Sequence, residues 1–505
     1  MGYLMGIDLG TSSVKTVLID ESGNIRGLAQ SDYPISIPRL GWAEQDPGTW
    51  WASAADTIRS SLRKAGVSPQ DVEAVGLSGQ MHGTVLLDNR RYVLRPAIIW
   101  PDQRTAHEVK RIYRELGRET LGKITLNPAC AGFQTLSLLW VREHEPENYR
   151  RIDKVLLPKD YVRLKLTGEI GTDVTDASAT LAFDTGRREW SMELIRRLGL
   201  DPGFYPPAAN PFDIAGYVTA EAARETGLAP GTPVVFGGGD QPMQAVGNGI
   251  VIPGQVSLTI GTGGQVFSVV ERPYYDPLLR THTFCHAVPG AWNIMGAMLS
   301  AGLSLSWLNR NVLSGLSYEE INELSGAVGP GSEGLIFLPY LSGERTPHMD
   351  PAARGAFIGL TLKHGKAHMI RAVMEGVVFG LRDSVEIFAS LGIPMDTFIA
   401  SGGGARSPVW MQIQADVLNR EIYKSSQTEQ ACVGAAIIAG VGVKRYSSVA
   451  EACRAVVRFV DRPATPIPGN VRVYEELYGM YRDAYRRNRT LFRKLGSVPS
   501  RTDED

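Results

Sequence analysis

One short stretch near the start of the chain combines the residue types that bind a phosphate and its metal ion. Gly10, Thr11, Ser12 and Ser13 follow Asp8 after a single leucine. Three hydroxyls and the backbone N–H groups of such a turn can wrap an anion, and a carboxylate beside it can face the accompanying cation. The combination indicates a magnesium–nucleotide site. The same residue types also make ordinary turns.

A second copy of this pattern favours the phosphate interpretation. Gly261, Thr262 and Gly263 lie between two β-branched runs, 257–260 and 264–268, about half the chain further on. Both copies predict a hairpin of strand, small-residue turn and strand. Two such hairpins, one opening each half, suggest a duplicated pair of domains whose turns face each other across a cleft.

Asp240 is the candidate for acid–base chemistry. It follows the apolar run 233–236 and three glycines, so it stands where ligand sites form in open α/β sheets. In a phosphoryl transfer it would orient a substrate hydroxyl and accept its proton, which contributes roughly 10²–10⁴-fold. The competing interpretation is a helix N-cap after a loop.

Two further segments are weaker candidates. Gly402-Gly403-Gly404, followed by Ser407, allows backbone to approach a ligand such as adenine and ribose, but a tight strand–helix turn has the same composition. The segment 79–83 places Met81 and His82 at the end of a strand, where a histidine also serves structural roles.

The elements that must position these residues alternate between strands and helices, which predicts an α/β architecture. Asp46 and Pro47 predict the start of a helix over 47–65. The sequence predicts further helices at 105–121, 135–145, 296–307 and 368–391, a helix ending at Gly168, and another starting at Pro408. It predicts strands at 72–78, 84–88, 334–341 and 398–401.

Length and composition bound the remaining possibilities. A chain of 505 residues is too long for one core. A net charge of −1 gives no reason to expect nucleic acid or an anionic membrane as partner. The longest apolar run, 431–443, is too short to span a bilayer, and the start resembles no signal peptide. The four cysteines form no zinc or disulfide pattern, which fits a reducing cytoplasm: Cys130, Cys285, Cys432 and Cys453.

Several other nucleotide and catalytic motifs are missing from the sequence. It contains no GxxxxGK[ST] loop, no HExxH, no GxSxG, and no dinucleotide fingerprint after a strand.

Taken together, the two hairpins resemble the phosphate loops of the actin, hexokinase and sugar-kinase superfamily. The wider set of segments is similar to the FGGY family of carbohydrate kinases and is spread over nearly the whole chain: 41–47, 237–241, 296–307 and 401–410. The resemblance implies two actin-like, ribonuclease H-like α/β domains flanking a central catalytic cleft. We expect an N-terminal domain over 1–252, a nucleotide-binding domain over 253–445, and a helical tail over 446–505 packed on the second domain.

The resemblance also implies roles for single residues. Asp240 would be the base acting on the sugar's terminal hydroxyl, and Asp8 would hold Mg²⁺ through water. The sugar would be bound by Met81, His82, Asp102, Asp240 and Gln241. The phosphates and the nucleotide of ATP would be bound by Thr11, Ser12, Ser13, Gly261, Thr262, Gly302, Ser306, Gly403, Gly404 and Ser407.

Within the family, several segments are similar to the xylulokinase branch: 79–83, 86–88, 99–105, 157–161, 176–178 and 183–184. The branch implies ATP-dependent phosphorylation of D-xylulose to D-xylulose 5-phosphate. This chain departs from relatives that have Asn-Asp-Gly-Arg where it has Pro101 to Arg104, and from some that have Asn where it has Gln241.

Two alternatives stay open on the sequence. One is a kinase for another sugar or polyol, such as ribulose, gluconate or glycerol. The other is an ATP-switched chaperone or filament protein on the same fold, which would give the segment 79–83 and Asp240 no shared purpose. The expected partners are a small sugar and ATP, without nucleic acid or membrane, and a homodimer is left open.

Overall fold

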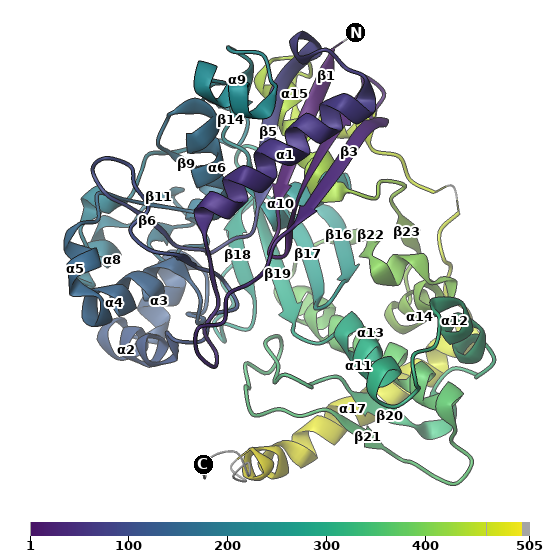
Figure 1. The fold of residues 1–505 in the computed structure, drawn as a ribbon. Helices are drawn as coiled ribbons and strands as arrows, with labels where there is room; N and C mark the ends of the chain where they lie inside the picture. The colour runs from purple at the N-terminus through teal and green to yellow at the C-terminus, as the bar shows by residue number, and fades with distance from the viewer. Residues whose placement is uncertain (1, 461, 497–505) are drawn as a thin grey trace. The chain divides into compact units, whose positions relative to one another are not determined.

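The computed structural model describes residues 2–460 and 462–496 (Figure 1). The chain divides into two compact units that are not simply consecutive in sequence. Unit 1 comprises the chain up to residue 252 together with 269–294 and 427–458. Unit 2 comprises 253–268, 295–426 and the chain from 459 onward.

The first sheet, in unit 1, brings together strands from both ends of the N-terminal half. Its order is β13-β14-β5-β1-β2-β3, and β15 also pairs with β5. The strands are β1 (Tyr3–Leu9), β2 (Ser13–Ile19), β3 (Ile25–Asp32), β5 (Val72–Gly79), β13 (Ile214–Tyr217), β14 (Pro233–Val235) and β15 (Gly238–Gly239). β5 runs parallel to β1 and to β15, so the carboxyl ends of these three strands lie at the same edge.

Shorter strands of unit 1 form two-stranded ribbons. They are β4 (Glu44–Gln45), β6 (Val85–Leu87), β7 (Ala97–Ile98), β8 (Lys154–Leu156), β9 (Thr172–Asp173), β10 (Phe183–Asp184), β11 (Glu189–Trp190) and β12 (Ala208–Ala209).

The helices of unit 1 are α1 (Pro47–Ala65), α2 (Ala106–Leu116), α3 (Arg118–Thr125), α4 (Gln134–His144), α5 (Pro146–Arg150), α6 (Pro158–Thr167), α7 (Val174–Ala177), α8 (Met192–Arg197), α9 (Ala220–Thr226), α10 (Asp240–Gly247), α15 (Gln430–Gly442) and α16 (Val449–Val456). Some of them, such as α1, α6 and α15, pack on strands of its sheet, and others lie in the segments between strands.

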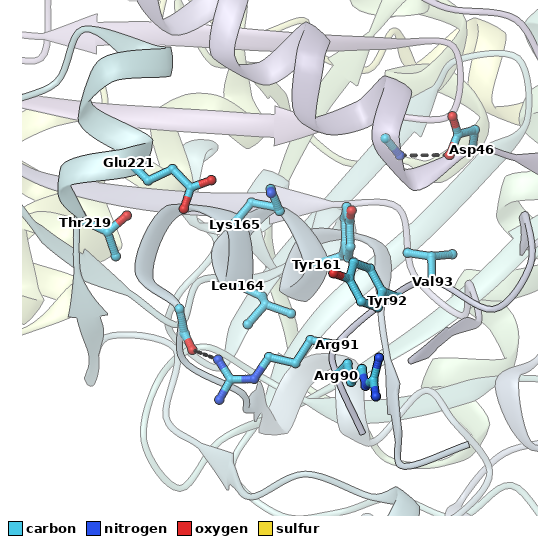
Figure 2. A pocket seen from close by; sticks show the side chains of 12 residues that line it. Asp46, Arg90, Arg91, Tyr92, Val93, Tyr161, Leu164, Lys165, Thr219 and Glu221 are labelled. Carbon is cyan, nitrogen blue, oxygen red and sulfur yellow. Dashed lines mark hydrogen bonds between the residues drawn. The ribbon is translucent and has the colours of Figure 1, made fainter. Parts of the chain in front are cut away.

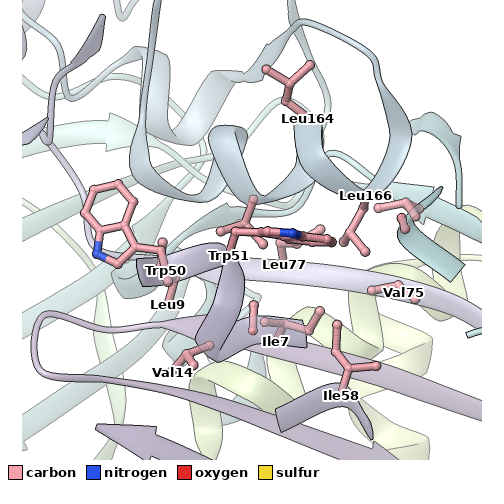
Figure 3. Close-up of a cluster of buried hydrophobic side chains, with 14 of the residues drawn as sticks. Ile7, Leu9, Val14, Trp50, Trp51, Ile58, Val75, Leu77, Leu164 and Leu166 are labelled. Atoms are coloured by element: carbon pink, nitrogen blue, oxygen red, sulfur yellow. The ribbon is translucent and has the colours of Figure 1, made fainter. Parts of the chain in front are cut away.

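Helix α1 shows how local sequence sets one of these elements. Asp46 caps the helix by accepting the N–H of Gly48 at 2.9 Å, Pro47 is its first residue, and Gly66 ends it in the left-handed conformation. Its buried face carries Trp50, Trp51 and Ile58, which pack with side chains of β1, β5 and α6 in one hydrophobic cluster (Figure 3).

The second sheet has the order β18-β19-β17-β16-β22-β23. Its strands are β16 (Gly254–Ile260), β17 (Gly264–Val270), β18 (His282–Cys285), β19 (Trp292–Met298), β22 (Met395–Gly402) and β23 (Ile422–Lys424), and a separate pair is formed by β20 (Ile336–Leu338) and β21 (Ala356–Ile358). The helices of unit 2 are α11 (Gly302–Asn311), α12 (Tyr318–Gly326), α13 (Lys366–Ser390), α14 (Pro408–Leu418) and α17 (Pro468–Leu495).

Both predicted hairpins are confirmed. β1 and β2 pair antiparallel with Asp8 opposite Lys15, and β16 and β17 pair antiparallel with Ile260 opposite Gly264. The helix starting at Pro408 is also confirmed, as is the helix that ends at Gly168.

Two predicted helices are wrong in part. Residues 105–121 form two helices, α2 and α3, because Gly117 adopts φ 78°, ψ 147° between them. The segment 296–307 begins as strand β19 and becomes helical only at Gly302. A short, continuously apolar run has no periodicity that separates a buried strand from a buried helix.

The described helices contain no segment that is both long and apolar enough to cross a membrane. The four cysteines are buried and unpaired with one another.

Candidate active site

The parallel register of the first sheet brings the two candidate carboxylates to one edge. Asp8 lies beside Ser78 of β5, and Ser78 lies beside Gly238 of β15, so the three residues form one row across the sheet. Neighbouring strands are about 4.8 Å apart, which places the backbones of Asp8 and Gly238 roughly 10 Å from each other. Asp240 follows two residues after this row, as the first residue of α10 with Gly239 as its N-cap.

Asp240 occupies surroundings that disfavour its charge. Burial and the nearby charge of Asp8 raise the pKa of Asp240 to about 7, and hydrogen bonds from Gln241 oppose the shift. A carboxylate with a pKa near neutrality is suited to accepting a proton at physiological pH. Asp240 is the first residue of α10 and Gly239 is its N-cap, so the interpretation of Asp240 as an N-cap is wrong.

Asp8 is the second carboxylate at this edge. Burial raises the pKa of Asp8, while the hydrogen bond from the Ser78 hydroxyl (2.6 Å) and the charge of Lys15 lower it. Lys15 itself is paired with Glu429 at 2.7 Å. Among the described residues, no three His, Cys, Asp or Glu side chains are grouped to hold a metal ion. One carboxylate nevertheless fits Mg²⁺, which keeps several waters and completes its shell with substrate phosphates.

The turn between β1 and β2 is held by one hydrogen bond within it and by two aromatic side chains outside it. Gly10 N–H donates to the Ser13 carbonyl at 2.9 Å, and Tyr33 donates to the Gly10 carbonyl at 2.6 Å. Trp100 Nε1 donates to the Thr11 hydroxyl at 2.8 Å. Within the described chain, the N–H groups of Thr11 and Ser12 have no acceptor, so this turn can offer both to an anion.

One buried glutamine ties this turn to the segment 79–83. Gln45 Nε2 donates to the Thr11 carbonyl at 2.7 Å, and Gln45 Oε1 accepts from Gln80 Nε2 at 2.9 Å. The predicted phosphate turn and the predicted sugar segment are therefore linked within unit 1.

Met81 lies close to the strand that precedes Asp240, and His82 is the next residue in the chain. A Cβ on Gly239 would approach Met81 Cγ to 2.7 Å, so the absence of a side chain at Gly239 lets Met81 pack there. His82 has φ 71°, and its ring stacks on Phe133 with ring centroids 4.0 Å apart. His82 Nδ1 is 2.8 Å from the carbonyl of Ala179.

Asp102 is fully buried, and both of its carboxylate oxygens are engaged by protein donors. Arg104 contacts both oxygens through Nε, at 2.9 and 3.0 Å, and the Ala43 N–H donates to one at 2.6 Å. This geometry favours a role in holding the loops that contain these residues. Its contact with the sugar stays a prediction, as does that of Gln241, which is half-buried beside Asp240.

In unit 2, the turn between β16 and β17 meets the start of α11. Gly302 N–H donates to the Gly261 carbonyl at 2.8 Å, and the Thr262 carbonyl accepts from the N–H groups of Ala301 and Leu303, both at 3.0 Å. A Cβ at Gly302 would lie 2.4 Å from the Gly261 carbonyl oxygen, so this approach requires glycine. Ser306 is half-buried on the same helix.

The glycine segment after β22 packs on the end of β16. A Cβ at Gly404 would lie 2.6 Å from Cβ of Ile260, and Gly403 is exposed. Ser407 caps α14 by accepting the Trp410 N–H at 3.1 Å, and its hydroxyl also bonds Asn322. Ser407 therefore has a structural task, and its contact with a nucleotide stays a prediction.

A pocket of about 560 Å³ elsewhere on unit 1 contains none of the predicted site residues (Figure 2). It lies beside α6, and its lining includes Arg90, Arg91, Tyr92, Tyr161 and Lys165. Arg91 donates to the Gly168 carbonyl at 2.6 Å at the end of α6.

Sequence reasoning missed several residues that support the site. Ser78, Gln45 and Trp100 contact predicted residues across sequence separations of 34 to 89 residues. The segments that contain Lys159 and Asp176 resemble those of relatives, but nothing in their local pattern indicates that the two side chains meet.

Comparison with known proteins identifies the family of this chain. The model of the N-terminal domain of the FGGY family of carbohydrate kinases matches residues 3–247, and that of the C-terminal domain matches residues 256–443. This chain belongs to the FGGY family of carbohydrate kinases, with the two-domain fold of that family.

The relatives within the family include several xylulose kinases. The chain is 36% identical to the xylulose kinase of Bacillus subtilis (strain 168) over 499 residues, covering 98% of this chain and 99% of that protein. It is 40% identical to the xylulose kinase of Escherichia coli (strain K12) over 449 residues, covering 88% and 91%. The crystal structure of xylulose kinase from Rhodospirillum rubrum matches with a TM-score of 0.90 at 32% identity, covering 97% and 99%.

Proposed function

We propose that this protein transfers the terminal phosphoryl group of ATP to D-xylulose, giving D-xylulose 5-phosphate and ADP. The observation that carries the proposal is the half-buried carboxyl of Asp240, with a pKa raised to about 7, at the strand edge that also carries Asp8. The relatives named xylulose kinase, which match over nearly their whole length, favour this substrate.

In the proposed reaction, Asp240 accepts the proton of the sugar's terminal hydroxyl as that oxygen forms a bond to the γ-phosphorus. The bond between the γ-phosphorus and the bridging oxygen breaks, and ADP leaves. The transition state of such a transfer is loose, so positioning and neutralisation of charge contribute most. Mg²⁺, when bound, would neutralise phosphate charge, and Asp8 would hold it through water.

The remaining residues would position the two substrates. Met81, which packs against Gly239, would bind the ketose together with its neighbour His82 and with Gln241, which follows Asp240. The free N–H groups of Thr11 and Ser12 would bind phosphate oxygens, together with Ser13 and the turn containing Gly261 and Thr262. Gly302, Ser306, Gly403, Gly404 and Ser407 would line the nucleotide site. We place the protein in the cytoplasm, a reducing compartment that fits four buried cysteines without a disulfide among them.

A panel of sugars tests the substrate. ADP release is measured with D-xylulose, D-ribulose, D-gluconate and glycerol, and kcat/KM should be highest for D-xylulose. A higher kcat/KM for another member of the panel would replace the substrate while leaving the kinase activity in place.

Asp240→Asn tests the base. The variant should lose at least about 10²-fold in kcat, the lower range for general base catalysis, and should still bind ADP in calorimetry. Asp153→Asn, which alters an exposed aspartate of the same unit, is the matched control. Unchanged turnover in Asp240→Asn would contradict the assignment of the base.

A further inference from the structure

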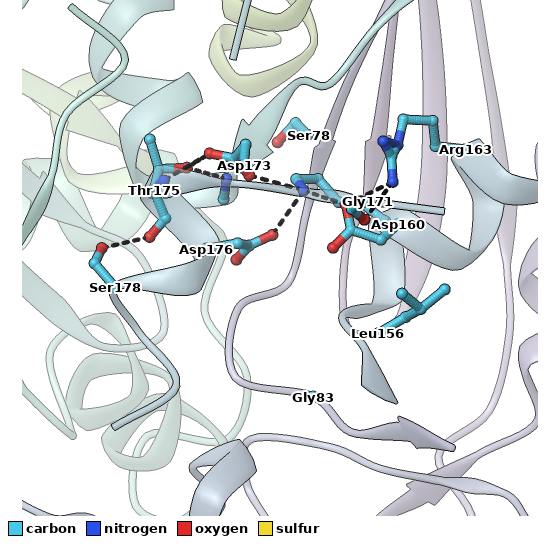
Figure 4. A network of polar contacts seen from close by, with 12 residues as sticks. Ser78, Gly83, Leu156, Asp160, Arg163, Gly171, Asp173, Thr175, Asp176 and Ser178 are labelled. Carbon is cyan, nitrogen blue, oxygen red and sulfur yellow. Dashed lines mark hydrogen bonds and ion pairs between the residues drawn. The ribbon is translucent and has the colours of Figure 1, made fainter. Parts of the chain in front are cut away.

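Figure 4 shows a buried cluster of charged side chains in unit 1. It lies against the strand that leads to Asp240, because a Cβ on Gly239 would lie 3.2 Å from Asp176 Oδ1. Lys159 Nζ contacts Asp160 at 2.7 Å, Asp173 at 2.8 Å and Asp176 at 3.1 Å. All four side chains, and that of Arg163 next to Asp160, are fully buried. Ion pairs buried this deeply lose much of their hydration and are weak evidence for stability by themselves. Their location is therefore more informative than their number.

The cluster contains one carboxyl more than it has cations. Three aspartates face Lys159 and Arg163, and burial together with the charges of Asp173 and Asp160 raises the pKa of Asp176 well above its usual value. The contact with Lys159 lowers the pKa of Asp176 and so opposes this shift.

A single hydroxyl connects the cluster to the candidate base. Thr175 Oγ1 donates to Asp173 Oδ2 at 2.5 Å and accepts the N–H of Gly239 at 3.0 Å. Gly239 is the N-cap of α10, and Asp240 is the next residue. A Cβ on Gly238 would lie 2.9 Å from the same hydroxyl, so strand β15 rests against Thr175.

The segment that contains Thr175 also contacts His82, one of the predicted sugar-binding residues. The Ala179 carbonyl, four residues after Thr175, lies 2.8 Å from His82 Nδ1. The Ser178 hydroxyl donates to the Thr175 carbonyl at 2.8 Å and accepts the Cys285 N–H at 3.0 Å, which fixes the segment further. Residues 173–180 therefore contact the backbone before Asp240 and the ring of His82 together.

We propose that Thr175, anchored by Asp173 and Lys159, is a positioning residue that sets Asp240 relative to the sugar hydroxyl. The inference rests on the proposed function, because it assumes that Asp240 is the base. Thr175 contacts neither substrate in this scheme and acts through the N–H of Gly239. A small displacement of a catalytic group can lower the rate on the order of 10²-fold. Loss of this one hydrogen bond can therefore lower kcat.

Thr175→Val tests this role because it keeps the shape of the side chain and removes the hydroxyl. The Gly239 N–H then loses its acceptor and Asp173 loses a donor. We expect kcat to fall by at least about 10-fold, with KM for D-xylulose and for ATP within about 2-fold, because the lost interaction places the base in the transition state. Thr175→Ser restores the hydroxyl and should recover kcat to within about 3-fold of the parent.

Thr172→Val is the matched control. Thr172 lies three residues earlier and is equally buried, but its hydroxyl has no hydrogen-bond partner among the described residues. This variant should keep the parent kcat. Thermal unfolding midpoints of all variants show whether they are folded at the assay temperature. If Thr175→Val is not, Thr175→Cys takes its place, since a thiol is a much weaker acceptor.

The outcomes separate this inference from the proposed function. If Asp240→Asn abolishes turnover while Thr175→Val behaves like Thr172→Val, the positioning role is overturned and the base assignment stands. Failure of Thr175→Ser to recover kcat would also overturn it, because the effect would then not come from the hydroxyl. If Asp240→Asn keeps its turnover, the assignment of Asp240 as the base is wrong, and the positioning role of Thr175 is overturned with it.

Discussion

The half-buried Asp240 and the fully buried Asp176 are two carboxyls whose surroundings raise their pKa. Burial and the charge of Asp8 raise the pKa of Asp240. Hydrogen bonds from Gln241 lower it in part, and the resulting pKa is about 7. Asp176 lies among other carboxyls and is raised well above its usual pKa despite Lys159. The pKa of Asp240 therefore lies where a group can exchange a proton near neutral pH.

The pH dependence of activity should report the first of these groups. A general base must be deprotonated, so kcat/KM for D-xylulose should rise with pH through about 7 and level off above it. The residual activity of Asp8→Asn should show this limb at lower pH, because a charge that raises the pKa of Asp240 has been removed. Steady-state assays from pH 5 to 9 measure both, and a limb near pH 4 in the parent would contradict the assignment.

The pH dependence of stability should report the second. The pKa of Asp176 is raised on folding, so its contribution to stability is present below about pH 4 and is lost as pH rises toward the folded pKa. Asp176→Asn removes this dependence. Its free energy of unfolding should gain on that of the parent as the pH rises above about 4, by up to about 1.4 kcal/mol per pH unit in urea titrations. Lys159→Met leaves buried carboxylates without their cation. Its free energy of unfolding should therefore be about 3–5 kcal/mol lower than that of the parent.

Helix α15 depends on glycines at its points of contact in unit 1. A Cβ at Gly6 of β1 would lie 1.9 Å from the Cys432 carbonyl oxygen, and one at Gly76 of β5 would lie 2.0 Å from that of Ala435. A Cβ at Gly434 of α15 would lie 1.9 Å from the carbonyl oxygen of Met243 in α10. Backbone therefore meets backbone where α15 crosses two strands and the helix that begins at Asp240.

Gly434→Ala should test this packing. The added methyl group meets a carbonyl that cannot rotate away, so α10 must shift, at a cost of about 1–3 kcal/mol, and kcat should fall with it. Gly479→Ala is the control, because Gly479 is an exposed glycine inside α17 with no atom near the added Cβ. It should gain about 0.5–1 kcal/mol in chemical denaturation without a change in kcat. Equal stability of Gly434→Ala and the parent would contradict the close approach.

At the scale of the whole molecule, unit 1 is completed by segments from far along the chain. Residues 427–458 supply α15 and α16, whose Ala435, Ile437 and Val449 are buried in one cluster with Leu4 and Val17. The first sheet would lose an apolar cover without them. The two units are thus interleaved in sequence even though each family domain model matches one continuous range.

A fragment test follows from this interleaving. Residues 1–252 alone should expose the face of the sheet that α15 covers, and should bind a hydrophobic dye and unfold without cooperativity. Co-expressed residues 427–458 should associate with the fragment and reduce dye binding, whereas the same segment with Ile437→Asp should not. Cooperative unfolding of 1–252 by itself would contradict the role of α15.

The sequence by itself predicted much of the local structure. The Asp46–Pro47 start of α1 and the glycine ends of α1 and α6 are local signals, because capping depends on a few adjacent residues. The two hairpins were equally predictable, since a small-residue turn joins strands adjacent in the chain. The prediction of one helix over 105–121 was wrong because Gly117 takes a conformation that interrupts it.

What the tertiary structure decided are the meetings between distant segments. The alignment of Asp8, Ser78 and Gly238 joins residues up to 230 positions apart, and no periodicity encodes the register of parallel strands. The contacts of Lys159 with Asp173 and Asp176, and of Thr175 with Gly239, likewise depend on how α6 and α7 pack behind β15. The sequence by itself determined which side chains are available for phosphoryl transfer. Only the folded chain determined their protonation and aim, because burial and neighbouring charge exist only after packing.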